Sequence, residues 1–261
     1  RDVERSRGLG DVYKRQEELP VSPQEFKSHT PIYAGKASEI MDSLHGLAVP
    51  EIVKVAKGGD STARNIWNHI QCFNDTKMGF KAVDAFTGVV FKQLHKGDYN
   101  MEQKEFLNRN LRIISSLYGW LRPDDIIKSY RFDFNLKLAP GGKSFKQFWK
   151  AGCTIALVNQ LRETFENEVV DLLPSEASAC IDWKMVRSVA DVYKVEFKVP
   201  SGPSTMKTPH AGRLKELRGR MLDLIIRERI SKATELKELE GDDFLPQGEL
   251  LYPNTFYYFS D

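Results

Sequence analysis

The sequence has few of the residues and motifs that mark the common classes of enzyme and metal site. Cysteine occurs only at Cys72, Cys153 and Cys180, with no CxxC pair and no His/Cys cluster at zinc spacing. The five histidines are scattered, and the motifs HExxH, GxxxxGK[ST], GxGxxG and GxSxG are absent. We therefore expect no metal ion, no cofactor and no recognisable catalytic residue, and reduced thiols in a cytoplasmic protein.

Long apolar runs and a strong net charge are lacking as well. No stretch of 18 apolar residues occurs, so we expect no transmembrane helix. A composition of 41% hydrophobic and 28% charged residues is typical of a globular protein rather than a disordered one. The formal charge of +2 excludes a nucleic-acid-binding protein that is basic over its whole surface, so any electrostatic function must come from local patches.

That small charge belongs to residues 1–16, RDVERSRGLGDVYKRQ. Removing their five basic and three acidic residues from the totals of 38 and 36 leaves 33 of each. The segment has neither an apolar core nor helical periodicity, and it resembles translated adapter sequence. We expect it to be non-native and the domain to span residues 17–261, the alternative being a genuine basic arm.

The hydropathy pattern of the remaining chain mixes helices and strands without regular βαβ units. It predicts helices over residues 36–47, 50–57, 61–72, 87–94, 100–116, 144–165, 182–188, 214–230 and 231–240. It predicts strands over residues 82–86, 131–138, 169–173, 192–199 and 252–259, with a loop over 200–210. Since no linker divides the chain, we expect one α+β domain with a mixed sheet flanked by helices.

Basic residues gather in two blocks. Residues 104–150 contain ten Lys or Arg against four Asp or Glu, and residues 184–220 contain nine against three. A neutral protein can therefore present a basic face, although the same charges would also suit the separate faces of an ordinary solvated surface.

The stretch 106–131, FLNRNLRIISSLYGWLRPDDIIKSYR, predicts an embedded helix–hairpin–helix. An amphipathic helix would end at Ser116-Leu117-Tyr118-Gly119, and a second helix would begin near Leu121. Leu117 would fill the space between the helices. Gly119 could take a positive φ or let a phosphate approach, and free N–H groups of the next helix would bind that phosphate. Arg112, Arg122 and Lys128 would add attraction without reading base sequence. A plain helix–turn–helix with a glycine cap is the alternative.

The same stretch resembles a hallmark of the YaaA family of bacterial peroxide-stress proteins. The family pattern is HLRxLSGLYGxLRPLDxxxPYRLEM, and this chain reads NLRIISSLYGWLRPDDIIKSYRFDF. Four further blocks follow the family order over residues 85–230: AFTGVVFKQL, SFKQFWK, VVDLLPSEA and KELRGRMLDLIIRERI. The chain is therefore similar to this family over most of its length.

The resemblance implies an α+β fold with a helix–hairpin–helix beside a basic cleft. It also implies binding of duplex or branched DNA and a role in limiting iron-driven damage during peroxide stress, without a settled enzymatic activity. Carried over by position, the DNA-binding residues would be Arg112, Ser116, Leu117, Tyr118, Gly119, Arg122, Arg131, Lys215, Arg218 and Gly219. Lys128 joins them through its charge alone, since the family pattern specifies no residue at that position. Pro123 and Tyr130 also match the family pattern. We expect the protein to be a monomer that binds DNA through its phosphates and does not associate with a membrane.

The chain departs from the family pattern at two places. The family begins with a strand that reads like IISPAKT, and nothing comparable occurs here. Asp171, Pro174 and Ala177 stand where the family has Asn, Ser and Tyr in its NLASxEY block. We expect an altered pocket if that block lines one, and a fold that is incomplete at one edge.

Two other functions stay open at this stage. An uncharacterised enzyme could hold a small anionic substrate in a pocket lined by Tyr130, Arg131, Lys215 and Arg218, since Arg and Lys suit carboxylate or phosphate. An interaction protein could offer its aromatic tail, residues 256–259, as a partner edge, although a buried strand explains the same residues. In the helix over residues 214–230, Glu216–Arg220 and Asp223–Arg227 have the spacing of salt bridges, so we expect Arg213, Arg220 and Arg227 to face solvent in ion pairs.

Overall fold

The structure is a computed structural model that describes residues 29–56, 58–75, 79–164, 167–202, 205–247 and 254–260. The described chain packs into two compact units. Unit 1 contains the described residues up to Thr87 with Leu111–Cys153 and Ser175–Ile181, and unit 2 contains Gly88–Asn110, Thr154–Pro174 and the described residues from Asp182 onward. The chain passes repeatedly between the units, so no linker separates successive domains. This is consistent with the expected single α+β domain.

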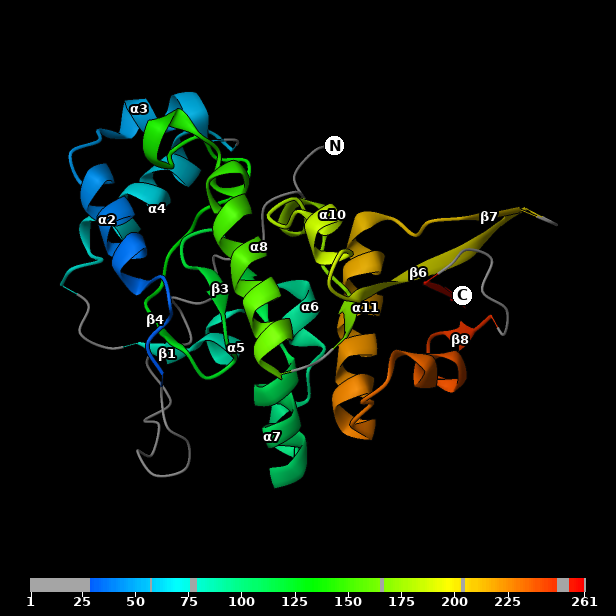
Figure 1. The fold of residues 1–261 in the computed structure, drawn as a ribbon. Coiled ribbons are helices and arrows are strands. Elements are labelled where there is room, and N and C mark those ends of the chain that lie inside the picture. The colour runs from blue at the N-terminus through cyan, green and yellow to red at the C-terminus, as the bar shows by residue number, and fades with distance from the viewer. Residues whose placement is uncertain are drawn as a thin grey trace. The chain divides into compact units, whose positions relative to one another are not determined.

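Unit 1 begins with a cluster of three helices, α2 (Ala34–Leu44), α3 (Val49–Val55) and α4 (Gly59–Gln71), which lie together in Figure 1. Helices α2 and α4 each bury a stripe of apolar side chains at helical spacing, such as Ile40 and Leu44 on α2 and Ile66 and Ile70 on α4, whereas α3 buries Ile52 alone. The N-terminus of α3 is closed by a hydrogen bond from the Ala48 N–H to the Glu51 carboxylate at 2.8 Å.

The rest of unit 1 consists of short strands and turns. Strand β1 (Phe80–Lys81) pairs with β4 (Ile126–Ile127), and β2 (Ile113–Ser115) pairs with β3 (Gly119–Leu121), both antiparallel. The helical turns are α5 (Ala82–Ala85), η2 (Pro140–Gly142) and α9 (Ser175–Ser178), and the long helix α8 (Phe145–Thr164) begins here.

Unit 2 contains the mixed sheet that the sequence predicts. Its order is β5 (Glu168–Asp171), β6 (Asp191–Gly202), β9 (Thr255–Phe259) and β8 (Leu245–Pro246), and β7 (Thr205–Lys207) also pairs with β6. The central pairs β5–β6 and β6–β9 are parallel, whereas β8 and β7 run antiparallel to their neighbours.

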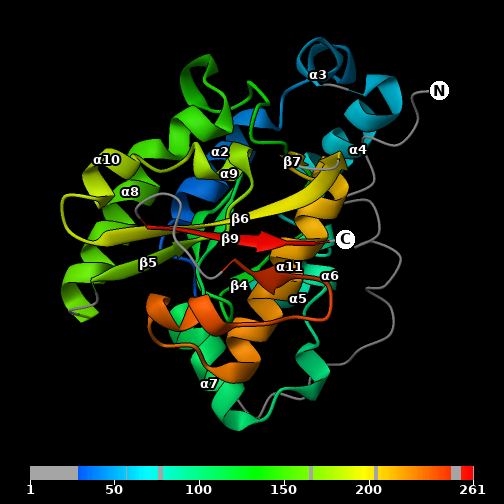
Figure 2. The same cartoon turned by 90° about the vertical axis from the view of Figure 1, so that its right-hand side faces the viewer.

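Helix α11 (Ala211–Glu228) covers one face of this sheet, as Figure 2 shows for β6 and β9. Leu217 and Met221 on the helix are fully buried and belong to one core cluster with Phe197 of β6 and Tyr258 of β9. Because side chains alternate between the two faces of a strand, Phe256 and Tyr258 of β9 face the helix and its core cluster, whereas Tyr257 and Phe259 face the other side. The tail over residues 256–259 is therefore largely a core strand, since only Phe259 is exposed.

Smaller helices complete unit 2. They are α6 (Val89–Lys92), η1 (Lys96–Asp98), α7 (Met101–Asn110), α10 (Trp183–Val186) and η3 (Ala233–Glu238). Among the described residues, no helix combines the length and the apolar character needed to cross a membrane.

Among the helix, strand and loop ranges predicted from the hydropathy pattern, four are wrong. Residues 82–86 form the helical turn α5 rather than a strand, and 131–138 form irregular chain with a turn at Phe134-Asn135. Part of the expected loop over 200–210 instead carries the end of β6 and strand β7. The helix expected over 100–116 ends at Asn110, and β2 follows. The last of these changes the site.

Candidate functional site

Residues 111–131 do not form a helix–hairpin–helix. Ile113 pairs with Leu121 and Ser115 with Gly119, so the stretch is a β-hairpin whose turn is Ser116-Leu117-Tyr118. Every residue from Ile113 to Leu121 is buried. The spacing of Leu107, Leu111 and Ile114 suggested a continuous helix, but a segment buried on both faces has no single apolar stripe, and its β-branched residues favour a strand.

Gly119 opens β3 with φ = +68°, in the left-handed region that favours glycine. A Cβ at this position would lie 2.5 Å from Cε3 of Trp149, a fully buried ring of α8. The indole N–H of Trp149 donates to the Ser116 carbonyl at 2.8 Å, which holds the ring over the turn. The glycine therefore admits an indole ring where the helix–hairpin–helix prediction placed a phosphate.

The polar side chains of the turn are also used internally. The Tyr118 N–H donates to Ser115 Oγ at 2.9 Å, and Ser116 Oγ donates to the Phe132 carbonyl at 2.9 Å. The Tyr118 hydroxyl accepts the Lys128 N–H at 3.0 Å, and the Tyr130 hydroxyl lies 2.7 Å from Ser115 Oγ. Ser116, Leu117, Tyr118 and Gly119, expected to bind DNA, instead build the core of unit 1.

The basic residues of the same stretch keep their access to solvent. Arg122 is exposed, and Arg112, Lys128 and Arg131 are half-buried. Burial, followed by the nearby charge of Arg122, lowers the pKa of Arg112 to about 10. Lys128 Nζ donates to the Phe73 carbonyl at 2.9 Å and lies 4.8 Å from the centre of the Phe73 ring, so part of its charge is already satisfied.

Two neighbouring carboxylates point inward, which the sequence did not reveal. Asp124 is 8% exposed and lies 3.0 Å from His29 Nδ1, and Asp125 is 3% exposed and accepts the Arg122 N–H at 2.8 Å. Burial raises the pKa of Asp125 against the opposing effect of that hydrogen bond and of the Arg122 charge. Nothing in the sequence around Asp124 and Asp125 distinguishes buried from exposed carboxylates.

The second predicted block lies on α11 in unit 2. Lys215 and Arg218 are half-buried, and Gly219 is buried where a Cβ would meet the Val90 carbonyl and Gln93 of the α6 region. Gly219 therefore serves close helix packing. Because this block and residues 111–131 belong to different units, the expectation that they share one basic cleft stays a prediction.

The remaining arginines of α11 are salt-bridged as expected, with one change of partner. Arg227 Nε lies 2.8 Å from Asp223, the predicted i,i+4 pair. Glu216 pairs with Arg213 at 3.5 Å instead of with Arg220, and Arg220 pairs with Asp243. None of these three arginines is assigned to DNA.

The pocket that the enzyme alternative requires is not supported at Tyr130. This side chain is 8% exposed and packs against Tyr118, Phe132 and Phe86, so it cannot face a substrate within unit 1. Asp171 and Pro174 of unit 2 are half-buried, and Ala177 of unit 1 is buried.

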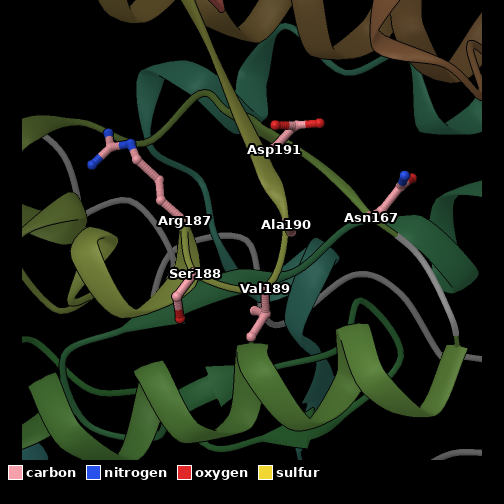
Figure 3. Close-up of a pocket in the computed structure, with 6 residues that line it drawn as sticks. All are labelled: Asn167, Arg187, Ser188, Val189, Ala190 and Asp191. Carbon is pink, nitrogen blue, oxygen red and sulfur yellow. The ribbon is translucent and has the colours of Figure 1, made fainter.

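A hollow of about 240 Å³ does occur in unit 2, lined by Asn167, Arg187, Ser188, Val189, Ala190 and Asp191. Figure 3 shows that its polar side chains diverge, with Arg187 and Asp191 pointing apart. None of the predicted site residues lines it. The described residues also contain no group of three or more His, Cys, Asp or Glu side chains placed to hold a metal ion.

The three cysteines are free thiols. Cys153 and Cys180 are fully buried, and burial raises the pKa of both, that of Cys180 to about 12. Because the thiolate is the reactive form, neither is suited to react with peroxide in the native state.

Comparison with known proteins decides the family. A family model described as "Peroxide stress protein YaaA" matches residues 13–249. The chain belongs to the YaaA family. Its curated relatives include UPF0246 proteins of Parabacteroides distasonis (29% identical, covering 82% of this chain and 84% of the relative) and Clostridium perfringens strain ATCC 13124 (28%, 84% and 86%). A third, from Desulfotalea psychrophila, is 29% identical over 84% of this chain and 86% of the relative. The family to which this chain belongs is thus one of peroxide stress proteins.

Proposed function

We propose that this YaaA-family chain acts in peroxide stress by binding DNA and limiting iron-driven damage to it. The binding would be non-specific, through phosphates of duplex or branched DNA, and the protein would act as a monomer in the cytoplasm. The contacts would come from basic side chains of residues 111–150, here called the basic segment, with Lys215 and Arg218 as further candidates. The helix–hairpin–helix has no part in this proposal.

One observation carries the proposal. The basic segment has eight basic residues, none of them buried: Arg112, Arg122, Lys128, Arg131, Lys137, Lys143, Lys146 and Lys150. Its acidic residues are Asp124, Asp125 and Asp133, of which the first two are buried. The surface of the segment therefore offers eight cations against one exposed carboxylate, a larger excess than the sequence count of eight to three.

The cations differ in how far they are engaged with the protein. Lys146 Nζ donates to Asn135 Oδ1, and Lys128 Nζ donates to the Phe73 carbonyl. Arg122, Lys137 and Lys143 are exposed and make no ion pair with any residue that the structure describes. These three are the cations best placed to exchange water and counterions for phosphate oxygens.

Titration of fluorescent duplex and four-way-junction DNA by anisotropy, over a series of salt concentrations, tests the proposal. The wild-type affinity should fall with salt on a log–log slope of about −0.9 for each phosphate contacted. The triple variant Arg122→Ala/Lys137→Ala/Lys143→Ala should reduce the magnitude of that slope by about 3, since each lost contact removes about one counterion.

A matched variant separates position from charge. Lys54→Ala/Lys92→Ala/Lys237→Ala removes three exposed cations outside the basic segment and so the same total charge. Its slope should stay near that of the wild type. Equal losses in the two triple variants, or no wild-type binding at low salt, would contradict the proposal.

A further inference from the structure

His95 and Asp223 form a hydrogen-bonded pair in unit 2. Asp223 lies on α11 and is 6% exposed, and His95 follows α6. Asp223 Oδ1 accepts the His95 N–H at 2.8 Å and the Tyr99 hydroxyl, while Oδ2 lies 2.9 Å from His95 Nδ1 and 2.8 Å from Arg227 Nε. Each carboxylate oxygen thus has two partners, the full number that its lone pairs can serve.

This arrangement fixes the tautomer of the imidazole. Burial opposes the charge on Asp223, but the donors from Tyr99, His95 and Arg227 hold the pKa of Asp223 below its usual value. An ionised carboxylate only accepts hydrogen bonds, so His95 Nδ1 must carry the hydrogen. The lone pair of the neutral ring is then on Nε2. The side chain of His95 is 61% exposed, so this nitrogen is accessible.

Three of the other histidines differ from His95 in ways that can be compared directly. At His210 the Nδ1 atom accepts the Arg213 N–H at 3.3 Å, which favours the opposite tautomer with the hydrogen on Nε2. His29 also faces a carboxylate, Asp124, at 3.0 Å, but its side chain is less exposed at 42%. His45 is exposed, and no carboxylate partner is found for it among the described residues.

We propose that His95 is a phosphoryl-acceptor site, modified at Nε2 by a small phosphoryl donor such as a phosphoramidate or an acyl phosphate. The Nε2 lone pair attacks phosphorus and the N–P bond forms. The bond from phosphorus to the leaving group breaks, and its electron pair departs with ammonia or with a carboxylate. The imidazole keeps its Nδ1 hydrogen and becomes positively charged. Asp223 stabilises that charge through the hydrogen bond it already accepts.

Cations on the same stretch of chain suit an anionic donor. Lys92 and Lys96 stand three residues before and one residue after His95, and Arg227 is 36% exposed beside Asp223. Lysine and arginine attract phosphate oxygens and neutralise the charge that accumulates during transfer. The orienting carboxylate, the accessible nitrogen and the flanking cations together define the chemistry of the site, independently of DNA binding.

Incubation of the full chain with potassium phosphoramidate near neutral pH provides the test. Peptide mass spectrometry should find His95 modified first, at a rate at least about tenfold above that of His45 or His210, and phosphorus NMR should place the group on Nε2. Labelling spread evenly over the exposed histidines, or faster at His29 than at His95, would overturn the proposal.

Variants separate orientation by Asp223 from simple exposure of His95. His95→Gln should abolish the principal label, and Asp223→Asn should slow it about tenfold. Tyr99→Phe removes another hydrogen bond to the same carboxylate and leaves the bond to His95, so it should label like the wild type. As a check that needs no variant, proton–nitrogen NMR of the wild type should show the Nδ1–H tautomer for His95 and the Nε2–H tautomer for His210. The reverse assignment for His95 would refute the mechanism.

Discussion

The sequence predicted the backbone conformation of Gly119 correctly, but it predicted the wrong neighbour for this residue, a phosphate instead of a tryptophan ring. The sequence predicted that the position needs the freedom of glycine, and φ = +68° confirms it. The neighbour that requires the missing side chain, Trp149, is 30 positions further along the chain, on another element. Local sequence reveals a backbone requirement, but it cannot identify a distant ring that fills the space.

Gly119→Ala should destabilise the protein by about 2–5 kcal/mol. A left-handed backbone costs a non-glycine residue about 1–2 kcal/mol, and overpacking against a buried ring adds about 1–3 kcal/mol. Urea denaturation measures this decrease in the free energy of unfolding, and the m-value should stay unchanged. Gly141→Ala is the matched control, because Gly141 has φ = +74° but open space around its Cβ position, so only the backbone cost applies. Equal losses at the two positions would show that Trp149 does not restrict the turn.

At the scale of elements, the sequence predicted the helices that have one apolar stripe, and it missed the strands and turns that are buried on all sides. The helices α2, α4, α8 and α11 lie within a few residues of their expected bounds, because each carries one apolar stripe. The β2–β3 hairpin was missed because both its faces are buried. The inward direction of Asp124 and Asp125 was missed because it depends on the fold of their own turn and on their partners, His29 for Asp124 and the Arg122 N–H for Asp125. Neither is evident from local sequence pattern.

The Asp223 carboxyl, which joins α11 to the chain on either side of η1, should make the stability of the protein depend on pH in the acid range. The folded-state pKa of this carboxyl lies below its unfolded value of about 4, so its contribution to stability is present above that value and is lost as the pH falls through the folded value. Asp223→Asn should cost about 3 kcal/mol near neutral pH, since buried donors lose a charged acceptor. Urea denaturation over a pH series should show the wild type and the variant converging below pH 4. A constant difference down to acid pH would contradict this assignment.

At the scale of the whole molecule, the net charge of +2 says little about where DNA would bind. The excess of five basic over three acidic residues in segment 1–16 accounts for the whole of this net charge. The proposed contacts lie instead in the basic segment, where two of the three acidic residues are buried. Sequence counts could predict a local excess of charge. They could not predict which charges remain at the surface, because that depends on packing.

Deleting residues 1–16 therefore separates the two possible sources of DNA affinity. The deletion removes five basic and three acidic residues and leaves the eight cations of the basic segment in place. If those cations carry the binding, the truncated chain should keep both the wild-type affinity and the wild-type salt slope in the anisotropy titration, because the number of counterions released is unchanged. Adding Arg122→Ala/Lys137→Ala/Lys143→Ala to the truncated chain should then lower the slope as it does in the full chain. Loss of the slope on deletion alone would place the phosphate contacts in the first sixteen residues and remove the basic segment from the proposed function.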